Sequence, residues 1–468
     1  MKDTIVLYPA PGLSHLVSMV ELGKLIIRHH SHAFSLTVLL ISGNSFSSPA
    51  VDSYIDHVSQ ENPSIVFDHF PALPNPQSSL GNPLVTFFQS IRSNNPNLRH
   101  TLQTISNTSS IAALVIGFFC NPAFPVAGEL NIPLYYYMPS GASALSFFIH
   151  LPKIHNQTDK SFRELGNTNI DIPGLSSIPA SKMPQTLLDR SSEIYDEFLN
   201  MGTYFTKSRG IITNTFEALE PRAIEAVARE TQAIFCVGPL VAEPRDQSSE
   251  SYCLSWLDAQ PRRSVVFLSF GSRGVFPAKQ IAEIAAGLEK SGQRFLWVVR
   301  SPPVHDSGNR ISLSATDDFD LESVMQEGFL DRTRDRGLVV KSWAPQVEVL
   351  NHESVGGFVT HCGWNSVLEA VCAGVPMLAW PLYAEQELNK VALVEEMKVA
   401  MPMEAAEEDG FVDAAEVEKQ IRALMESEEG KKMKDRCREM REKALAAWAE
   451  DGSSKTALTK LAESWKRT

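Results

Sequence analysis

The stretch that decides the fold runs from Trp343 to Gln386 and reads WAPQVEVLNHESVGGFVTHCGWNSVLEAVCAGVPMLAWPLYAEQ. Residues 356–360 (GGFVT) form a short apolar run that is typical of a buried strand. The turn His361-Cys362-Gly363 follows, and residues 364–373 predict a helix. A strand that leads through a glycine turn into a helix presents free backbone N–H groups and a partial positive charge. This arrangement favours a phosphate.

Polar side chains gather at the same end of the predicted helix. His361, Asn365 and Ser366 supply hydrogen-bond donors beside the free N–H groups. Glu369 lies one turn further, four residues after Asn365, where its carboxylate can accept hydrogen bonds from ribose hydroxyls. Together these parts predict a site for a nucleotide sugar.

Position by position, the whole stretch resembles the signature of plant family 1 UDP-sugar-dependent glycosyltransferases, and weaker resemblance extends over the rest of the chain. The resemblance implies that uracil stacks on Trp343 and is hydrogen-bonded by Ala344 and Gln346. It implies that His361, Asn365 and Ser366 hold the diphosphate, that Glu369 binds the ribose, and that Trp364, Glu385 and Gln386 contact the sugar. Gly363 lies in the turn, and Ser272 approaches the phosphates from a second Gly turn.

The choice of sugar follows from two positions. The family associates glutamine at the position of Gln386 with glucose. Trp364 is uncharged, whereas transfer of glucuronic acid favours a cation that meets the sugar carboxylate. We therefore expect UDP-glucose as the donor substrate and no separate cofactor.

Alternation of apolar strands with helical stretches predicts the fold class. Parallel strands buried on both faces read as continuous apolar runs. In the first half they are expected at 5–8, 36–41, 65–69, 112–118 and 134–137, and in the second at 264–270, 294–299, 338–341 and 356–360. The resemblance implies the GT-B architecture, an α/β fold of two Rossmann-like domains that face a cleft, with a C-terminal helix packing back on the N-terminal domain.

Segment boundaries follow from composition. The polar stretch 243–251 (EPRDQSSES) has the composition of a linker. We expect an acceptor-binding N-terminal domain over residues 1–240, a linker over 241–253, a UDP-sugar-binding C-terminal domain over 254–450 and a returning terminal helix over 451–468. Two further stretches, 157–184 and 301–322, are expected to be loops.

Bulk properties exclude several classes of partner. The 468 residues carry a net charge of −13 with a pI near 5.5, which argues against nucleic acid or an anionic membrane. No apolar run is long enough for a membrane span, and the start resembles no secretory signal. The six cysteines lack paired spacing, as expected of free thiols in the cytoplasm. We expect a cytoplasmic monomer.

One short motif suggests a metal but is interpreted otherwise. Asp318-Phe319-Asp320 is formally the Asp-x-Asp that binds divalent cations in another glycosyltransferase fold. Such a pair should end a buried strand, whereas this one lies in polar sequence. We therefore predict a surface loop and no metal site.

His15 is the candidate general base. Pro9 to Ser14 form a turn after the first predicted strand, and His15 opens the next helix. A helix N-terminus disfavours imidazolium and keeps the ring able to accept a proton near neutral pH. From the residues alone a structural role is the favoured interpretation. The resemblance implies catalysis, because the family's base follows this same turn.

Gly117 departs from the family pattern. The family places an Asp there, at the end of the strand 112–118, to orient the histidine and stabilise its charged form. Three explanations stay open: another group or a water holds His15, the acceptor is a phenol acidic enough to need less help, or the nucleophile is an aromatic carbon beside a phenolate. Arg273, another departure, either lines the acceptor mouth or is solvated.

Aromatic residues predict the kind of acceptor. Several lie in pairs or runs, of which a minority is expected to line a cleft: Phe87-Phe88, Phe118-Phe119, Tyr135-Tyr136-Tyr137 and Phe147-Phe148. A flat phenol of the flavonoid or chalcone type suits them. The opening residues 1–26 and residues 138–152 resemble the branch of the family that acts on such phenolics.

The sequence thus predicts an inverting transfer of glucose from UDP-glucose to a phenolic small molecule, with His15 as base. Two alternatives stay open. One is a C-glycosyltransferase acting on the aromatic ring, which the missing Asp at Gly117 raises. The other is a weakly catalytic UDP-sugar-binding protein, against which Trp364, Glu385 and Gln386 speak.

Overall fold

The computed structural model describes residues 2–42, 48–73, 82–241, 250–303, 319–406 and 410–466. The chain divides into two compact units. The first comprises residues 1–181, 186–242 and 446–468, and the second comprises residues 182–185 and 243–445. Most of the predicted linker, 242–249, lies outside the described residues.

A parallel sheet of seven strands forms the centre of the first unit, in the order β3-β2-β1-β4-β5-β8-β9. Its order reverses between β1 and β4, so the loops after these two strands diverge and leave room for a ligand at their carboxyl ends. The strands are β1 (Asp3–Tyr8), β2 (Phe34–Leu40), β3 (Ile65–His69), β4 (Ile111–Gly117), β5 (Leu134–Met138), β8 (Gly210–Thr213) and β9 (Ile234–Cys236).

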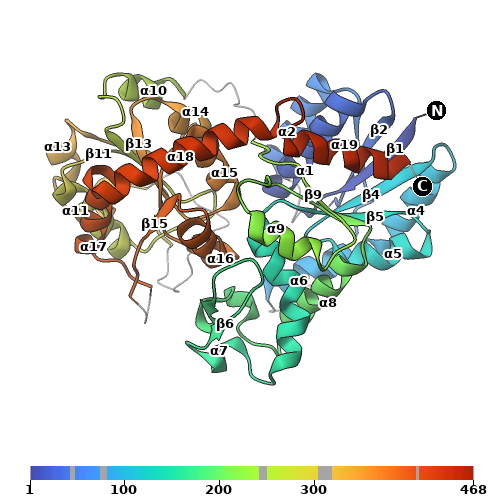
Figure 1. The fold of residues 1–468 in the computed structure, drawn as a ribbon. Helices are drawn as coiled ribbons and strands as arrows, with labels where there is room; N and C mark the ends of the chain where they lie inside the picture. Colours follow the sequence, from blue (N-terminus) through green and yellow to red (C-terminus); the bar gives the residue numbers. More distant parts are fainter. Residues whose placement is uncertain are drawn as a thin grey trace. The chain divides into compact units, whose positions relative to one another are not determined.

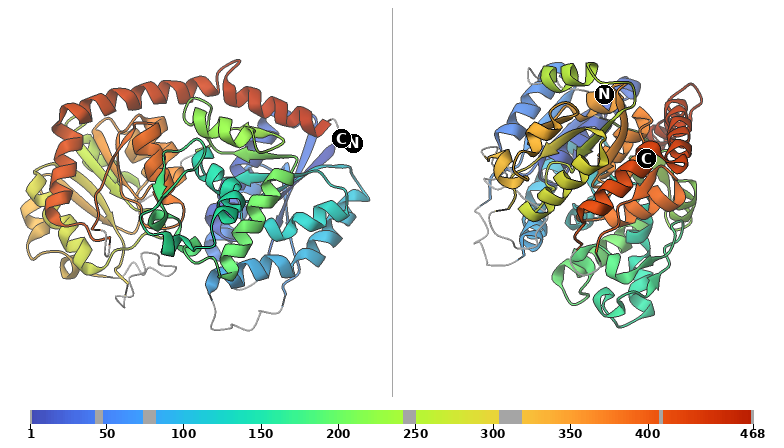
Figure 2. Two further views of the ribbon diagram at one scale, coloured as in Figure 1. Left: turned by 60° about the horizontal axis from the view of Figure 1, so that its bottom comes forward. Right: turned by 90° about the vertical axis from the view of Figure 1, so that its left-hand side faces the viewer.

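Helices cover both faces of this sheet (Figure 2). One face packs against α1 (Leu13–His30), α2 (Pro49–Glu61) and the last helix, α19 (Ser453–Lys466), in a continuous apolar core. On the other face Tyr136 packs edge-on against Phe205 of α8 (Glu193–Lys207), with ring centroids 4.7 Å apart. The remaining helices of four or more residues are α3 (Pro83–Ser93), α4 (Asn95–Ser106), α5 (Phe124–Glu129), α6 (Ala142–Gln157), α7 (Phe162–Leu165) and α9 (Pro221–Ala228).

The last helix belongs to the first unit although it follows the whole second unit in sequence (Figure 1). Trp465 is almost fully buried and packs edge-on against Phe34 and Tyr135. The Ser454 hydroxyl donates to the carbonyl oxygen of Gly238. The preceding long helix, α18 (Glu428–Ala447), lies in the second unit as far as Leu445.

The second unit repeats the same design with six parallel strands in the order β12-β11-β10-β13-β14-β15. Its order reverses between β10 and β13, which places a second ligand position at the carboxyl ends of those strands. The strands are β10 (Val265–Ser269), β11 (Arg294–Val299), β12 (Gly337–Lys341), β13 (Val355–Thr360), β14 (Met377–Ala379) and β15 (Ala400–Pro402).

Helices of the second unit fill the crossovers between its strands. Gly292, in the left-handed region at φ +69°, ends α11 (Ala278–Ser291) and lets the chain turn into β11. The other helices are α10 (Glu250–Asp258), α12 (Leu321–Val324), α13 (Phe329–Thr333), α14 (Gln346–Asn351), α15 (Trp364–Ala373), α16 (Gln386–Val391) and α17 (Ala414–Glu426).

One loop prediction needs correction, and the other lies mostly outside the described residues. Residues 157–184 contain α7 and a small hairpin of β6 (Asn169–Ile170) and β7 (Ile178–Pro179), because a Ser161–Glu164 capping box starts a short helix there. Most of the stretch 301–322 lies outside the described residues, Asp318 included. Asp320 is described, and its side chain accepts from the backbone N–H of Glu322 as the N-cap of α12.

Candidate active site

The centre of the donor site is the turn after β13, where the order of the second sheet reverses. Ser269 at the end of β10 pairs with Thr360 at the end of β13, so the residues that follow these strands are neighbours. One of them, Gly271, has φ +74°, and a Cβ there would lie 2.5 Å from Nε2 of His361. A Cβ on Gly363 would lie 2.3 Å from the same atom. The His361 ring therefore packs against two glycine turns, and neither glycine tolerates a side chain.

His361 is neutral in this setting. The residue is buried, and burial lowers the pKa of its imidazole to about 4. Its Nδ1 has no hydrogen-bond partner within the described part of the chain. The ring therefore offers a polar nitrogen at the start of α15, where a diphosphate would also meet free backbone N–H groups.

Asn389, which the sequence analysis missed, supports the turn at Cys362 through a hydrogen bond. Cys362 adopts φ +65°, a conformation that costs free energy for a residue with a side chain. The fully buried Asn389 donates from Nδ2 to the Cys362 carbonyl oxygen at 3.0 Å. This hydrogen bond supports the strained turn that carries His361. The mixed polar sequence around it, ELNKV over residues 387–391, gave no signal for this role.

Gln346, Ser366 and Glu369 form a connected group. The Gln346 side-chain nitrogen donates to Ser366 Oγ at 2.8 Å and to Glu369 Oε2 at 2.6 Å. Gln346 begins α14, whereas the other two lie on the first two turns of α15. The residues proposed for the uracil edge, the phosphate and the ribose are therefore brought together within one hydrogen-bonded group.

Glu369 is held in an unusual protonation state. Burial raises the pKa of its carboxyl group to about 7, and the hydrogen bond from Gln346 opposes part of that rise. The carboxyl group that the sequence predicts for the ribose is thus partly protonated near neutral pH. Ligand binding is expected to draw it into the charged form.

Trp343 stands at the edge of the sheet, two residues after the end of β12. Its side chain is 48% exposed, which is unusual for so large an apolar group. Ser342 before it adopts φ +63°, and Ala344 after it is buried. The backbone is therefore fixed on both sides of an open indole face, as stacking on a base requires.

Gln386, at the start of α16, is 3% exposed and is used partly by the protein itself. Its Oε1 accepts from the backbone N–H groups of Leu382 and Tyr383, at 2.8 and 2.9 Å. Its side-chain oxygen is thereby committed to the loop, and a further hydrogen bond joins its side chain to that of Tyr383. Glu385 precedes it and is partly exposed, whereas Trp364, at the start of α15, is 3% exposed.

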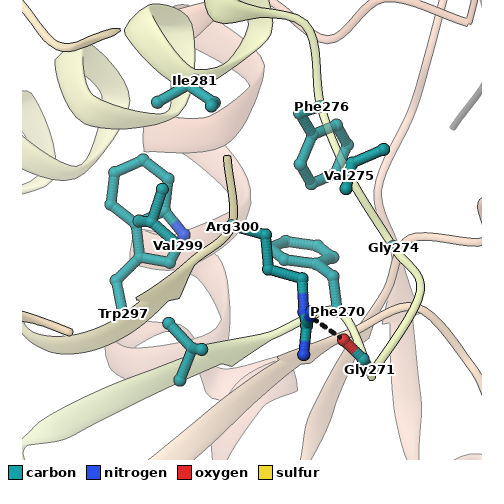
Figure 3. Close-up of a pocket in the computed structure, with 10 residues that line it drawn as sticks. Phe270, Gly271, Gly274, Val275, Phe276, Ile281, Trp297, Val299 and Arg300 are labelled. Atoms are coloured by element: carbon teal, nitrogen blue, oxygen red, sulfur yellow. Dashed lines mark hydrogen bonds between the residues drawn. The ribbon is translucent and has the colours of Figure 1, made fainter. Parts of the chain in front are cut away.

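The turn after β10 carries the remaining predicted donor residue. Ser272 and Arg273 are both exposed. Arg300, which the sequence analysis did not single out, donates from Nε to the Gly271 carbonyl oxygen at 3.1 Å (Figure 3). Asn365, exposed on the first turn of α15, completes the set.

His15 lies in the first turn of α1, after β1 of the first unit. Its ring contacts that of Phe119 edge-on, with centroids 5.4 Å apart. Phe119 follows β4, so the pair spans the two strands between which the order of the first sheet reverses. A base and an apolar ring thus lie together where this fold class binds ligands.

Gly117 is the last residue of β4 and lies against the turn that leads to His15. Tyr8 in β1 pairs with Ile116 in β4, so the residues after them are neighbours. A Cβ on Gly117 would meet the backbone nitrogen of Ala10 at 3.0 Å. Any side chain at this position therefore requires the Pro9–Ala10 backbone to shift by a few tenths of an ångström.

The aromatic residues named from sequence separate into two groups. Phe88, Phe118, Phe148 and the three consecutive tyrosines are buried in the core. Phe87 and Phe119 are partly exposed, with ring centroids 5.8 Å apart in an edge-on contact. These two form the exposed end of a phenylalanine cluster that reaches from the core to His15.

Comparison with known proteins identifies the family. The family described as UDP-glucoronosyl and UDP-glucosyl transferase matches residues 192–432. UDP-glycosyltransferase 88F3 of Pyrus communis is 51% identical over 97% of this chain and 98% of its own. Phloretin 2'-O-glucosyltransferase of Malus domestica is 49% identical over 97% of this chain and 98% of its own. The solved structure of Phytolacca americana UGT2 complexed with UDP-2fluoro-glucose and pterostilbene has a TM-score of 0.88 and 34% identity, covering 99% of this chain and 100% of that one.

Two parallel sheets in Rossmann order and the likeness to this solved structure define a glycosyltransferase of the GT-B architecture, as the sequence predicted. The chain belongs to the UDP-sugar-dependent glycosyltransferases of plant family 1. Two further facts concern only the described residues. None of their helices is long and apolar enough to cross a membrane, and they contain no group of three or more metal-ligating side chains.

Proposed function

We propose that this enzyme transfers glucose from UDP-glucose to a hydroxyl group of a phenolic acceptor, with inversion at the anomeric carbon. The observation that carries the donor half is the Gln346–Ser366–Glu369 group beside the neutral His361 at the start of α15. The partners proposed for uracil, ribose and diphosphate thus lie at the start of α14 and on the first two turns of α15.

Glucose is favoured by the residues at the sugar end. Trp364 is uncharged, and the Gln386 amide nitrogen carries two hydrogens, so it can donate to a sugar hydroxyl beside its hydrogen bond with Tyr383. The names of the relatives agree, since the apple relative is a glucosyltransferase and the pokeweed structure contains a fluoro-glucose donor. A phenolic acceptor is supported by the pair of partly exposed rings beside His15 and by the phenols in those same names.

In the proposed reaction His15 accepts the proton of the phenol. The phenolate oxygen attacks the anomeric carbon on the face opposite the diphosphate, a carbon–oxygen bond forms, and the bond to the diphosphate oxygen breaks. UDP leaves with its new negative charge beside the N–H groups of α15, Asn365 and Ser366. These donors supply the stabilisation of the leaving group, so we propose a reaction that needs no metal or other cofactor.

Gly117 favours a second candidate function, transfer to an aromatic carbon next to a phenolate. Without a carboxylate at this position the family's His–Asp pair cannot form at His15. A bound phenolate needs less help from a base, and its ring carbon can then compete with its oxygen as nucleophile.

The test is incubation of the purified protein with UDP-glucose and a panel of phenols, with mass spectrometry and NMR of the products. An O-β-glucoside is expected, and it should survive addition of EDTA. His15→Ala should lower kcat by about 10² to 10⁴, the usual contribution of a general base. A product that resists acid and glucosidase would establish the C-glycoside instead, and a His15→Ala variant with unchanged kcat would remove His15 from the mechanism.

We further propose a cytoplasmic monomer. All six cysteines are free, as expected in a reducing compartment. Light scattering of the purified protein and imaging of a tagged protein in plant cells check the two statements.

A further inference from the structure

Arg300 connects two neighbouring strand ends in the second unit. It follows Val299 of β11, and β11 pairs in parallel with β10, so both strands end at the same edge of the sheet. From there its Nε donates to the Gly271 carbonyl oxygen in the turn after β10, at 3.1 Å. Figure 3 shows the side chain extending toward that carbonyl.

The aliphatic part of Arg300 is supported by packing. It lines a small cavity of about 20 Å³ together with the apolar side chains of Phe270, Phe276 and Trp297. Phe270 and Phe276 are buried and pack edge-on, with centroids 4.7 Å apart. The guanidinium therefore lies at the end of a stem that is half-buried among fixed rings, and its reach to Gly271 is set by that packing.

Gly271 transmits this contact to the donor site in two ways. Its Cα lies against His361, since a Cβ there would meet Nε2 at 2.5 Å. Its carbonyl also shares a planar trans peptide group with the N–H of Ser272, and the two point in opposite directions. Fixing the Gly271 carbonyl on Arg300 therefore fixes where the Ser272 N–H points.

The charge of Arg300 also reaches the loop before α16. Burial raises the pKa of Tyr383, while a hydrogen bond with Gln386 and the charges of Arg273 and Arg300 oppose the rise. The guanidinium thus contacts the Gly271 turn and is close enough to Tyr383 to affect the pKa of its phenol. Both segments belong to the proposed donor site.

We propose that Arg300 is a positioning residue of the donor site: it anchors the Gly271 carbonyl so that the Ser272 N–H and the His361 ring are set for the diphosphate. This role rests on the proposed function, because it presumes that UDP binds at the start of α15. It assigns Arg300 to the phosphate part of the donor and not to the nucleoside part.

Calorimetric titration with uridine and with UDP tests whether Arg300 acts on the phosphate part or on the nucleoside part of the donor. The wild type should bind both, more tightly for UDP. Arg300→Gln should weaken UDP about ten-fold, the usual loss of a charge-assisted hydrogen bond, and leave uridine unchanged. Arg300→Lys keeps the charge without the planar Nε donor, so it should recover part of the UDP affinity.

Arg294→Gln is the matched control. Arg294 opens the same strand at its other end and likewise hydrogen-bonds to its neighbours, Gln260 Oε1 at 3.2 Å and the Asp335 carbonyl at 3.4 Å. This variant should change neither affinity. Equal losses for uridine and UDP in Arg300→Gln, or an unchanged UDP affinity, would overturn the assignment. If Arg300→Gln does not fold, the affinities of Arg300→Lys for uridine and for UDP are compared with those of the wild type in the same way. A wild type that binds neither ligand would instead refute the proposed function.

Discussion

The Gln346 side-chain nitrogen lies 2.6 Å from Glu369 Oε2 and 2.8 Å from Ser366 Oγ, so one amide group uses both of its hydrogens inside the donor site. The acceptor groups for the nucleotide are therefore already oriented in the free protein. Preorganisation of this kind reduces the entropy lost on binding. It also ties the protonation of Glu369 to ligand binding, from which the first prediction follows.

Uridine affinity is expected to rise with pH. The Glu369 pKa of about 7 is raised above its ordinary value of 4.5, and ribose hydroxyls bind the ionised form. If binding returns that pKa to its usual range, the affinity for uridine should increase about ten-fold between roughly pH 6 and pH 8. Uridine is the ligand to titrate by calorimetry, because it carries no phosphate whose charge changes over this range.

Glu369→Gln provides the control. It should bind uridine more weakly and without this pH dependence. The raised pKa also means that Glu369 contributes stability below about pH 4.5, and that this contribution is lost as the pH rises through 7. The apo variant should therefore lose less stability than the wild type over that interval. A wild type with a flat uridine profile would show that Glu369 does not contact the ribose.

Gly271→Ala should damage the site beyond its cost in stability. Gly271 and Gly292 have nearly the same φ, +74° and +69°, but a Cβ on Gly292 has nothing within 4 Å. Alanine at either position costs about 1 kcal/mol of strain. Only Gly271→Ala should also displace His361 and weaken UDP binding by about ten-fold or more, about 1.4 kcal/mol. Thermal denaturation and UDP titration of both variants measure the two effects, and equal UDP affinities would contradict the expectation.

Substitutions of Gln386 should separate its support of the loop before α16 from its proposed contact with the sugar. Gln386→Ala removes the acceptor for Leu382 and Tyr383, so it should lower both Tm and kcat/KM for UDP-glucose. Gln386→Glu keeps an oxygen for the two N–H groups and removes the nitrogen that would bind the sugar. We expect it to lower kcat/KM with a smaller change in Tm. An unchanged kcat/KM for Gln386→Glu would mean that Gln386 only supports the loop.

Gly117→Asp should be compared with Gly117→Ala and not with the wild type alone. Both introduce a Cβ 3.0 Å from the Ala10 nitrogen, and both disturb the turn before His15 by the same contact. Only the Asp variant adds a carboxylate that can orient His15. If the base lacks support, its rate of O-transfer should exceed that of Gly117→Ala by about ten-fold or more. Equal rates would indicate that the site has been rebuilt around Gly117.

Much of the fold was predictable because its strands are buried on both faces. The run at 294–299 matches β11 residue for residue, since its continuous apolar sequence is buried from Phe295 to Val299. The run at 65–69 also matches β3, although β3 is an edge strand on which Val66 is exposed. The short strands β8, β9, β14 and β15 were missed. With three or four residues each, they are set by pairing with neighbours rather than by a pattern of their own.

The site was predictable as far as it is continuous in sequence. The block from Trp343 to Gln386 contains all the proposed donor residues except Ser272, and the structure brings Gln346, Ser366 and Glu369 into contact. Arg300 and Asn389 could not be assigned from sequence. Their roles arise from a strand neighbour and a buried carbonyl, which are relationships of the folded chain.

The docking of α19 has a consequence for how the protein is made. Leu458, Leu461, Ala462 and Trp465 belong to the same core as Ile5 and Leu7 at the start of the chain. A ribosome that has released only the N-terminal half has produced a sheet with one face still partly uncovered. That surface stays partly uncovered until α19, which follows the second unit in sequence, has been translated. We therefore expect chaperones that bind exposed apolar surface to bind the nascent first unit.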